Sequence, residues 1–207
     1  INPDLVISEE SIINLINVLK NNNDCAIAAP ITTPDKDYYG IFPEKGKGVK
    51  RNQNEIKLCK ILENSKIEGE CCVDVAKGCA LLINSSYFKK INMFNEKYFL
   101  FWEEIDFCRK VRKNKLSVIV TPKSEAHHAQ ESSSKKNLLT FSIRTYHHEL
   151  SPLIYFGSKK LSKIIIWRLL KYIFRTFSYL LILNFKKSFS NFLKFLATFN
   201  YFIGIYG

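Results

Sequence analysis

Residues 103–122 read EEIDFCRKVRKNKLSVIVTP, and in them a helix pattern is followed directly by a strand pattern. In the first half, Ile105, Cys108 and Val111 recur every three positions, which is typical of one buried face of a helix. LSVIVTP at 116–122 is a short apolar run rich in β-branched residues, and we expect its proline to end it. The stretch therefore predicts a helix that leads into a buried strand.

The same order of elements occurs at the start of the chain. A helix pattern begins at Ser8 or Glu9, carries a broad apolar face and ends in the polar residues 21–24. CAIAAP at 25–30 then has the composition of a second buried strand closed by proline. Helices and strands that alternate in this way favour a sheet covered by helices. We therefore predict an α/β fold for residues 1–135.

Further short elements are expected between these two helix–strand pairs. Residues 73–75 alternate between apolar and polar as in a strand, and CALLI at 79–83 is a second apolar run. Residues 86–92 predict a short helix. In contrast, residues 31–70 are polar with scattered Gly, Pro and Lys, which is the composition of a long surface excursion.

The formal charge of +12 is concentrated in the C-terminal tail. From residue 135 onward the sequence has twelve of its 31 Lys and Arg, but a single acid, Glu149. These cations interrupt apolar helical runs, whereas a groove that follows nucleic-acid phosphates would carry them on a polar face. We therefore do not expect a nucleic-acid partner.

The six cysteines and four histidines do not form a zinc pattern. No cysteine pair has CxxC spacing, and the histidines occur as two adjacent doublets. We expect the cysteines to be reduced thiols in the protein core.

The tail contains two apolar segments, 161–183 and 188–206. A helix that crosses a bilayer needs about 20 apolar residues, whereas the longest uncharged run here, 195–207, has thirteen. We therefore expect interfacial amphipathic helices whose cations meet anionic headgroups at the cytoplasmic face of a membrane. A helical pair packed on the protein's own body remains open, and a transmembrane hairpin is the weaker alternative. On this basis 136–207 is predicted as a membrane-associating helical tail.

Three short stretches carry groups suited to catalysis. Glu103 and Glu104 follow an aromatic run, and aromatic shielding beside two adjacent carboxylates suits a general base. Asp4 lies at an expected strand end, where a carboxylate is suited to holding a divalent ion against a diphosphate. AHHAQESSS at 126–134 offers imidazoles for a metal or a phosphate. Each stretch alone also fits a structural explanation: a helix start, a turn and a solvated loop.

Taken in order, these stretches resemble the family-2 glycosyltransferases of the GT-A fold, in particular the rhamnosyltransferase-like enzymes of cell-wall and surface-polysaccharide assembly. That family carries an NPD, a Gly-(Ala/Cys) apolar strand, a GxFDExFFxxxEDxDxCxR stretch and a Pro-x5-His-x4-Ser segment. Here these are INPD, GCALLI, NMFNEKYFLFWEEIDFCRK and PKSEAHHAQESS. The resemblance covers roughly residues 1–135. It implies the C-terminal portion of a Rossmann-like GT-A domain, and we expect the nucleotide-binding start of the fold to lie upstream of Ile1.

The resemblance also implies roles for individual residues. Glu104 stands at the catalytic base, beside Glu103. Asp4 and His128 stand at metal positions, for Mg²⁺ or Mn²⁺. The remaining positions, which the resemblance assigns to donor or acceptor binding, are Asn2, Gly78, Trp102 and Asp106.

The implied reaction is inverting transfer of a sugar from a nucleotide-sugar donor to a polysaccharide or lipid-linked acceptor. The sequence departs from the family pattern at several positions. The family's Glu-Asp pair is Glu-Glu here, its Asp is Asn95, and a Gly in the turn after the helix is Lys115. The alternative is a membrane-surface assembly protein that keeps the fold without the transfer. We expect these 207 residues alone to be inactive.

Overall fold

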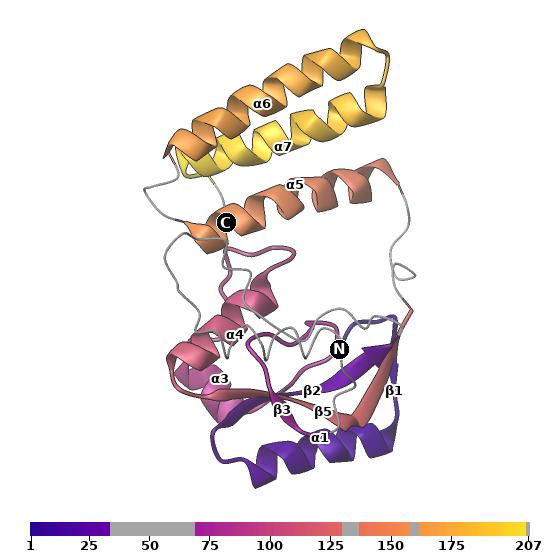
Figure 1. The fold of residues 1–207 in the computed structure, drawn as a ribbon, viewed down its shortest axis with the longest axis vertical. Coiled ribbons are helices and arrows are strands. Elements are labelled where there is room, and N and C mark those ends of the chain that lie inside the picture. Colours follow the sequence, from indigo (N-terminus) through magenta and orange to yellow (C-terminus); the bar gives the residue numbers. More distant parts are fainter. Residues whose placement is uncertain (34–68, 130–136, 158–161, 206–207) are drawn as a thin grey trace. The chain divides into compact units, whose positions relative to one another are not determined.

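The structure is a computed structural model that describes residues 1–33, 69–129, 137–157 and 162–205 (Figure 1). The chain divides into two units. The first consists of Ile1–Phe94 and Glu104–Ser133, and the second of Asn95–Glu103 and Ser134–Gly207. Most of the surface excursion predicted at 31–70, and of the polar loop predicted after His128, lies outside the described residues.

A five-stranded mixed sheet forms the centre of the first unit. Its strands are β1 (Leu5–Ile7), β2 (Cys25–Thr33), β3 (Cys71–Cys72), β4 (Leu82–Ile83) and β5 (Ser117–His128). β5 runs parallel to β2 and antiparallel to β1 and β3, and β4 pairs antiparallel with β2. With helices α1 (Glu9–Asn21), α3 (Ser85–Lys90) and α4 (Glu103–Lys113), the structure is a mixed α/β one, which confirms the predicted fold class at this level.

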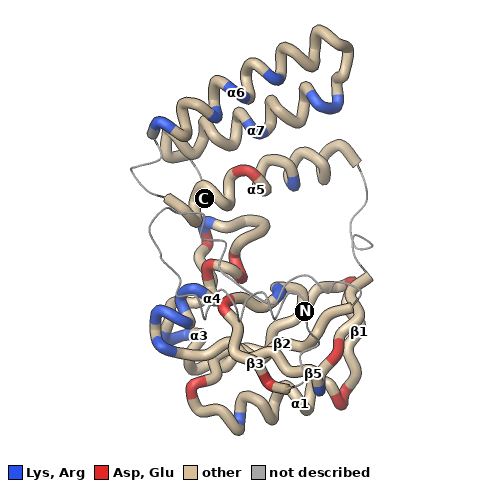
Figure 2. The backbone as a smooth tube through the Cα atoms, viewed as in Figure 1, with Lys and Arg blue, Asp and Glu red and all other residues tan. Residues whose placement is uncertain are grey.

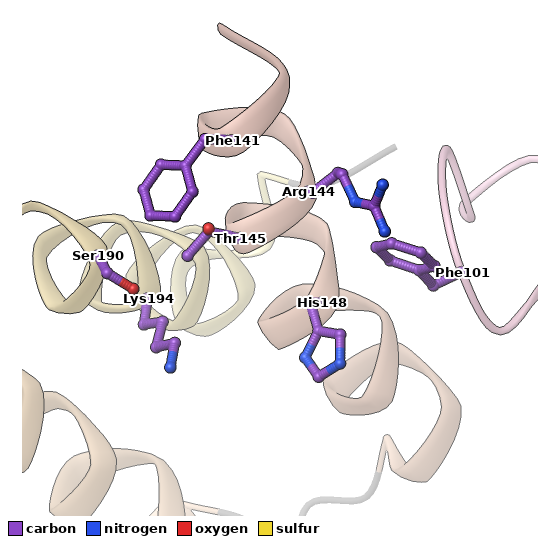
Figure 3. Close-up of a pocket in the computed structure, with 7 residues that line it drawn as sticks. All are labelled: Phe101, Phe141, Arg144, Thr145, His148, Ser190 and Lys194. Carbon is purple, nitrogen blue, oxygen red and sulfur yellow. The ribbon is translucent and has the colours of Figure 1, made fainter. Parts of the chain in front are cut away.

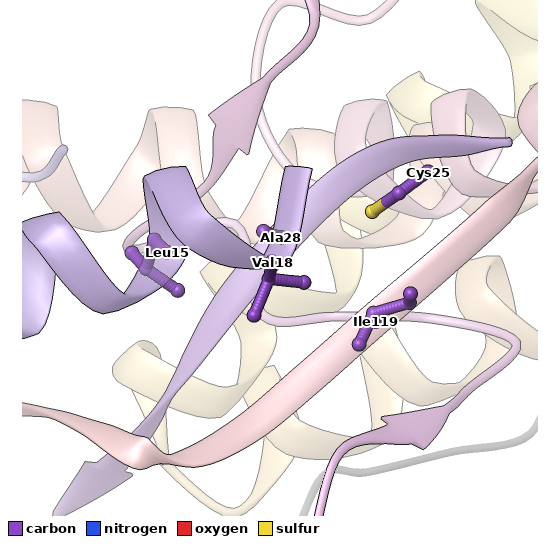
Figure 4. Close-up of a cluster of buried hydrophobic side chains, with 5 residues drawn as sticks. All are labelled: Leu15, Val18, Cys25, Ala28 and Ile119. Carbon is purple, nitrogen blue, oxygen red and sulfur yellow. The ribbon is translucent and has the colours of Figure 1, made fainter. Parts of the chain in front are cut away.

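Helix α1 (Glu9–Asn21) covers the sheet through an apolar face. It begins at Ser8, whose side chain accepts a hydrogen bond from the backbone N–H of Ser11. This N-cap satisfies a donor that the first turn would otherwise leave unpaired. The buried cluster beneath the helix, shown in Figure 4, consists of Leu15, Val18, Cys25, Ala28 and Ile119. Burial of each large side chain contributes about 1.5–3 kcal/mol.

The prediction that Pro122 ends its strand is wrong. β5 continues to His128, because residues 122–124 fall in a register shift between β2 and β5. Proline is tolerated in a sheet at such irregularities, where no ladder hydrogen bond is required of it. Beyond the shift β5 pairs with β1, so His127 and His128 are strand residues and not part of a loop.

The prediction that Pro30 closes the strand at 25–30 is also wrong, because β2 runs past a register shift to Thr33. In contrast, the strand predicted at 73–75 does not form and the one at 79–83 is shortened. β3 precedes residues 73–75, and β4 takes only the end of 79–83. Asp74 instead forms an ion pair with Arg112 of α4. The expected strand end before Asp4 is a turn that leads into β1, since Pro3 has no N–H to donate to a ladder.

Two helices follow β4 in the first unit. α3 (Ser85–Lys90) and α4 (Glu103–Lys113) confirm the helices predicted at 86–92 and from residue 103 onward. Phe107, Cys108 and Val111 of α4 are fully buried, whereas Ile105 is half-buried. The Phe107 ring lies 5.2 Å from Phe88 and 4.9 Å from Phe94 between centroids. This aromatic cluster fixes α4 against α3.

The second unit is built from α5 (Leu138–Phe156), α6 (Ser162–Leu181) and α7 (Phe185–Ile203). α6 and α7 confirm that the two apolar tail segments are helical, and α7 packs against both α5 and α6 (Figure 1). Cations recur along α6 and α7, and Glu149 is the acid of α5 (Figure 2). No described helix is long and apolar enough to cross a membrane.

Glu149 has a structural partner on α6. Its carboxylate lies 2.5 Å from a guanidinium nitrogen of Arg168 and accepts a hydrogen bond of 2.8 Å from the hydroxyl of Tyr172. Burial, together with the neighbouring carboxylate, raises the pKa of Tyr172. Glu149, the acid of the basic tail, therefore connects α5 to α6.

Candidate functional site

The turn before β1 brings Asp4 to His128. Leu5 pairs with His128 in the β1–β5 register, and the N–H of Ala129 donates to the Asp4 carbonyl at 3.0 Å. As a result His128 Nε2 lies 3.3 Å from Asp4 Oδ1. The Asp4 side chain is only 5% exposed and that of His128 18%. The pair therefore joins a carboxylate and an imidazole in a largely desolvated place.

Strand alternation decides which histidine takes part. Along β5, Ala126 is buried, His127 is exposed and His128 is half-buried. Successive side chains of a strand point to opposite faces, so only one residue of the doublet can lie beside Asp4. The structure places His128 there, as the sequence predicted.

Asn2 connects this pair to the turn around Gly78. Its backbone N–H donates to the carbonyl of Cys79 at 2.9 Å. Its side-chain nitrogen lies 3.5 Å from His128 Nε2, a weak contact whose direction depends on the histidine tautomer. The N-terminal turn is thereby held against the segment that leads into β4.

Gly78 is in turn pressed against Glu104. A Cβ at this glycine would lie 3.1–3.2 Å from three side-chain carbons of Glu104, whereas carbon atoms pack best at about 3.5–4.0 Å. Its φ is not positive, so the close approach and not the backbone conformation requires glycine here. Glu104 also lies in the first turn of α4, where the helix macrodipole favours a carboxylate.

A continuous set of contacts within the first unit therefore links Glu104 to the Asp4–His128 pair, through Gly78, Cys79 and Asn2. These residues belong to four separate motifs of the sequence, and the contacts link the four motifs.

Asp106 lies apart from this set. It is 3% exposed, and its carboxylate pairs with Arg109 at 2.6 Å and lies 3.8 Å from the Lys110 ammonium. Lys110 also donates to the carbonyl of Met93 at 3.1 Å. Sequence reasoning missed these partners, although their i+3 and i+4 spacing from Asp106 is a recognisable signal. The arrangement suits a residue that positions α4 better than one that contacts a substrate.

Trp102 and Glu103 belong to the second unit. The Trp102 ring lies 5.0 Å from Tyr155 and 5.5 Å from Phe156 of α5, between centroids. Trp102 has a φ of 72° and the residue before it a φ of 65°, so two consecutive large residues are left-handed. Such conformations cost about 1–3 kcal/mol each and tend to occur at functional sites.

The set of contacts that links Glu104 to Asp4 and His128 offers two ligands to a divalent metal, the Asp4 carboxylate and the His128 imidazole. No group of three or more His, Cys, Asp or Glu suited to a metal ion occurs within residues 1–33, 69–129, 137–157 and 162–205. Asp4 Oδ1 is buried and has no hydrogen-bond partner among those residues. Mg²⁺ bound with substrate phosphates needs only one or two protein carboxylates. Asp4 and His128 therefore fit a site that a diphosphate completes.

The expectation that the cysteines lie in the core holds for three of the five described ones. Cys25, Cys79 and Cys108 are buried, whereas Cys71 is half-buried and Cys72 is exposed. Burial raises the pKa of the Cys108 thiol to about 12 and that of Cys25 to about 11. Neither is suited to act as a nucleophile at neutral pH, because the thiolate is the reactive form.

No known protein family profile matches the chain. The chain is 29% identical, over 118 residues, to a low-salt glycan biosynthesis hexosyltransferase of Haloferax volcanii. The match covers 57% of this chain and 37% of that protein. The chain thus spans well under half the length of this curated relative.

Proposed function

We propose that the protein is a glycosyltransferase of the GT-A type that moves a sugar from a nucleotide-sugar donor to a glycan or lipid-linked acceptor. The similarity to a hexosyltransferase supports sugar transfer in general. The observation that carries the proposal is the continuous set of contacts that joins the Glu104 carboxylate to the Asp4–His128 pair. A rhamnosyl donor is the first to assay, because of the sequence resemblance.

Glu104 acts in this proposal as the general base. Its carboxylate takes the proton of an acceptor hydroxyl while that oxygen bonds to the anomeric carbon of the donor sugar. The bond from that carbon to the diphosphate breaks on the opposite face, so the configuration inverts. Gly78 leaves room for the Glu104 side chain, because a Cβ there would lie 3.1–3.2 Å from its carbons.

Asp4 and His128 would hold the divalent cation, Mg²⁺ or Mn²⁺, and Asn2 supports His128. When bound, such an ion stabilises negative charge on a leaving diphosphate. The desolvation of Asp4 strengthens its attraction for a cation, since charges interact more strongly away from water.

We further propose that the second unit binds the cytoplasmic face of an anionic membrane. α6 exposes large apolar side chains at helical spacing, namely Trp167, Leu170, Phe174, Phe177 and Leu181. Their exposed fractions run from 61% to 84%, far above those of core residues. Lys163, Lys171 and Arg175 lie on the same helix (Figure 2). Apolar residues flanked by cations favour an interfacial helix.

Two experiments test these proposals. The protein at its natural length, purified from its own cell, is incubated with labelled nucleotide sugars, Mg²⁺ or Mn²⁺ and a lipid extract of that cell. We expect label in the lipid or glycan fraction, and loss of this label with Asp4→Asn.

Sedimentation with phosphatidylglycerol vesicles tests whether the protein binds an anionic membrane. Retention on DNA at the same salt concentration is the comparison. Vesicle binding without turnover of any donor would favour the assembly protein and contradict the enzyme.

A further inference from the structure

A cavity of about 350 Å³ lies within the second unit, between α5 and α7 (Figure 3). This volume is within the range of about 300–1,000 Å³ that is usual for small-molecule sites. Two phenyl rings, of Phe101 and Phe141, contribute to its wall. Its polar lining is Arg144, Thr145, His148, Ser190 and Lys194.

Helical spacing explains why these side chains meet. Arg144, Thr145 and His148 lie at i, i+1 and i+4 of α5, and Ser190 and Lys194 at i and i+4 of α7, so each group shares one helix face. Figure 3 shows Thr145 turned toward α7, while Arg144 reaches toward Phe101. The His148 ring lies 5.8 Å from the Phe101 ring between centroids. The Arg144 guanidinium carbon lies 6.0 Å from the Phe101 ring centroid.

The cationic side chains of this lining are those of Arg144 and Lys194. No carboxylate is among the described residues that line the cavity. Glu149 follows His148 directly but is engaged by Arg168 and Tyr172 of α6. The Lys194 ammonium makes no ion pair with any residue in the described part of the chain. Both cations would attract an anion that enters the cavity.

We propose that this cavity binds a phosphate or diphosphate group. A guanidinium fork, an ammonium and two hydroxyls supply donors of hydrogen bonds to phosphate oxygens. The phosphate has two possible sources: a lipid-linked diphosphate acceptor, which rests on the proposed function, or a free diphosphate. The site lies on α5 and α7, apart from the residues assigned to catalysis, so its binding is measurable without sugar transfer.

Isothermal titration of the full chain with inorganic pyrophosphate tests whether the protein binds the diphosphate group that both sources share. We expect Arg144→Gln/Lys194→Gln to weaken binding at least tenfold, because it removes charge-assisted hydrogen bonds to the phosphate oxygens. The matched control is Lys97→Gln/Lys187→Gln, which removes two positive charges from exposed positions of the same unit. Lys194→Arg should retain binding, and circular dichroism confirms that each variant is folded. No binding by the unaltered protein, or an equal loss in the control, would overturn the proposal.

An experiment with vesicles distinguishes a lipid-linked diphosphate from a free diphosphate. Neutral phosphatidylcholine vesicles that contain an isoprenoid diphosphate are compared with vesicles given the same charge by phosphatidylglycerol. For a lipid-linked source we expect preference for the diphosphate vesicles, lost in Arg144→Gln/Lys194→Gln. For a free source we expect pyrophosphate binding with no vesicle preference. If the protein binds neither pyrophosphate nor the diphosphate vesicles, the cavity is not a phosphate site, whatever the transfer assay shows.

Discussion

At the scale of single residues, the contact between Gly78 and Glu104 is the most sensitive part of the proposed site. A methyl group on Gly78 would meet three carbons of the Glu104 side chain, and the carboxylate would have to move. A displacement of about 1 Å at a reacting group costs roughly a hundredfold in rate. The sequence predicted both residues as site residues, but their contact depends on how the chain before β4 approaches α4.

We therefore expect Gly78→Ala to lower turnover by about 10–100-fold while leaving the thermal midpoint nearly unchanged, since Gly78 itself is exposed. Gly69→Ala is the control, because nothing lies within 4 Å of a Cβ placed there. Steady-state kinetics and thermal denaturation of both variants check this. Equal turnover in the two variants would show that the contact does not position the base.

Lys115 is a second residue whose conformation matters, because its left-handed backbone lowers the stability of the fold. Its φ is 59°, and the end of α4 is closed by hydrogen bonds from Leu116 to Val111 (3.1 Å) and from Lys115 to Arg112 (2.9 Å). This is the Schellman arrangement, in which glycine is the usual left-handed residue. The resemblance had marked this position as a departure from glycine, and the structure gives that departure a physical meaning.

We expect Lys115→Gly to raise the free energy of unfolding by about 1 kcal/mol, measured by urea denaturation. Lys113→Gly, inside the last turn of α4, should lower it by about 1 kcal/mol, because glycine there loses more backbone entropy. A change of the same sign in both variants would contradict the left-handed assignment of Lys115.

At the scale of elements, strand β5 provides His128 and pairs with β1, which brings this histidine to Asp4. Helices α1, α4, α6 and α7 were predictable because their apolar residues repeat with a local period. The length of β5 was not, since the register shift at Pro122 depends on its pairing with β2, which is distant in sequence. The brevity of β3 and β4 was unpredictable for the same reason. The resemblance singled out His128 by its spacing from Pro122, but the approach of His128 to Asp4 depends on the pairing of β5 with β1.

We expect His128→Ala to weaken Mn²⁺ binding by about 10–100-fold, as loss of a ligand or its close support does at metal sites. His127→Ala is the neighbouring control, because its side chain is on the exposed face of β5. Electron paramagnetic resonance titration of Mn²⁺ measures both variants. The same affinity in the two would remove His128 from the proposed metal site.

At the scale of the whole molecule, the chain divides into a nearly neutral α/β unit and a basic helical unit. Charge counting alone indicated a change near residue 135. It gave no sign that 95–103 groups with the helices, which the rings of Phe99, Phe101 and Trp102 on α5 explain. Aromatic packing between segments distant in sequence leaves no local pattern.

The Glu149 contacts should stabilise the helical unit. We expect Glu149→Gln to lower the free energy of unfolding by about 1–3 kcal/mol, a value reduced because Arg168 is about one-third exposed. Glu96→Gln, at an exposed position in the same unit, is the control. Urea denaturation followed by circular dichroism at 222 nm, where helices dominate the signal, measures both. No difference between the variants would show that the pair is dispensable.

The most direct test of the account is sugar transfer by Glu104→Gln, measured with the protein at its natural length. Glutamine preserves the size of the side chain beside Gly78 but cannot accept the proton of the acceptor hydroxyl. We predict a loss of about 100–10,000-fold in turnover, with vesicle binding unchanged, whereas Glu96→Gln retains activity. Near-normal turnover by Glu104→Gln would contradict the assignment of the base, and with it the mechanism proposed for this protein.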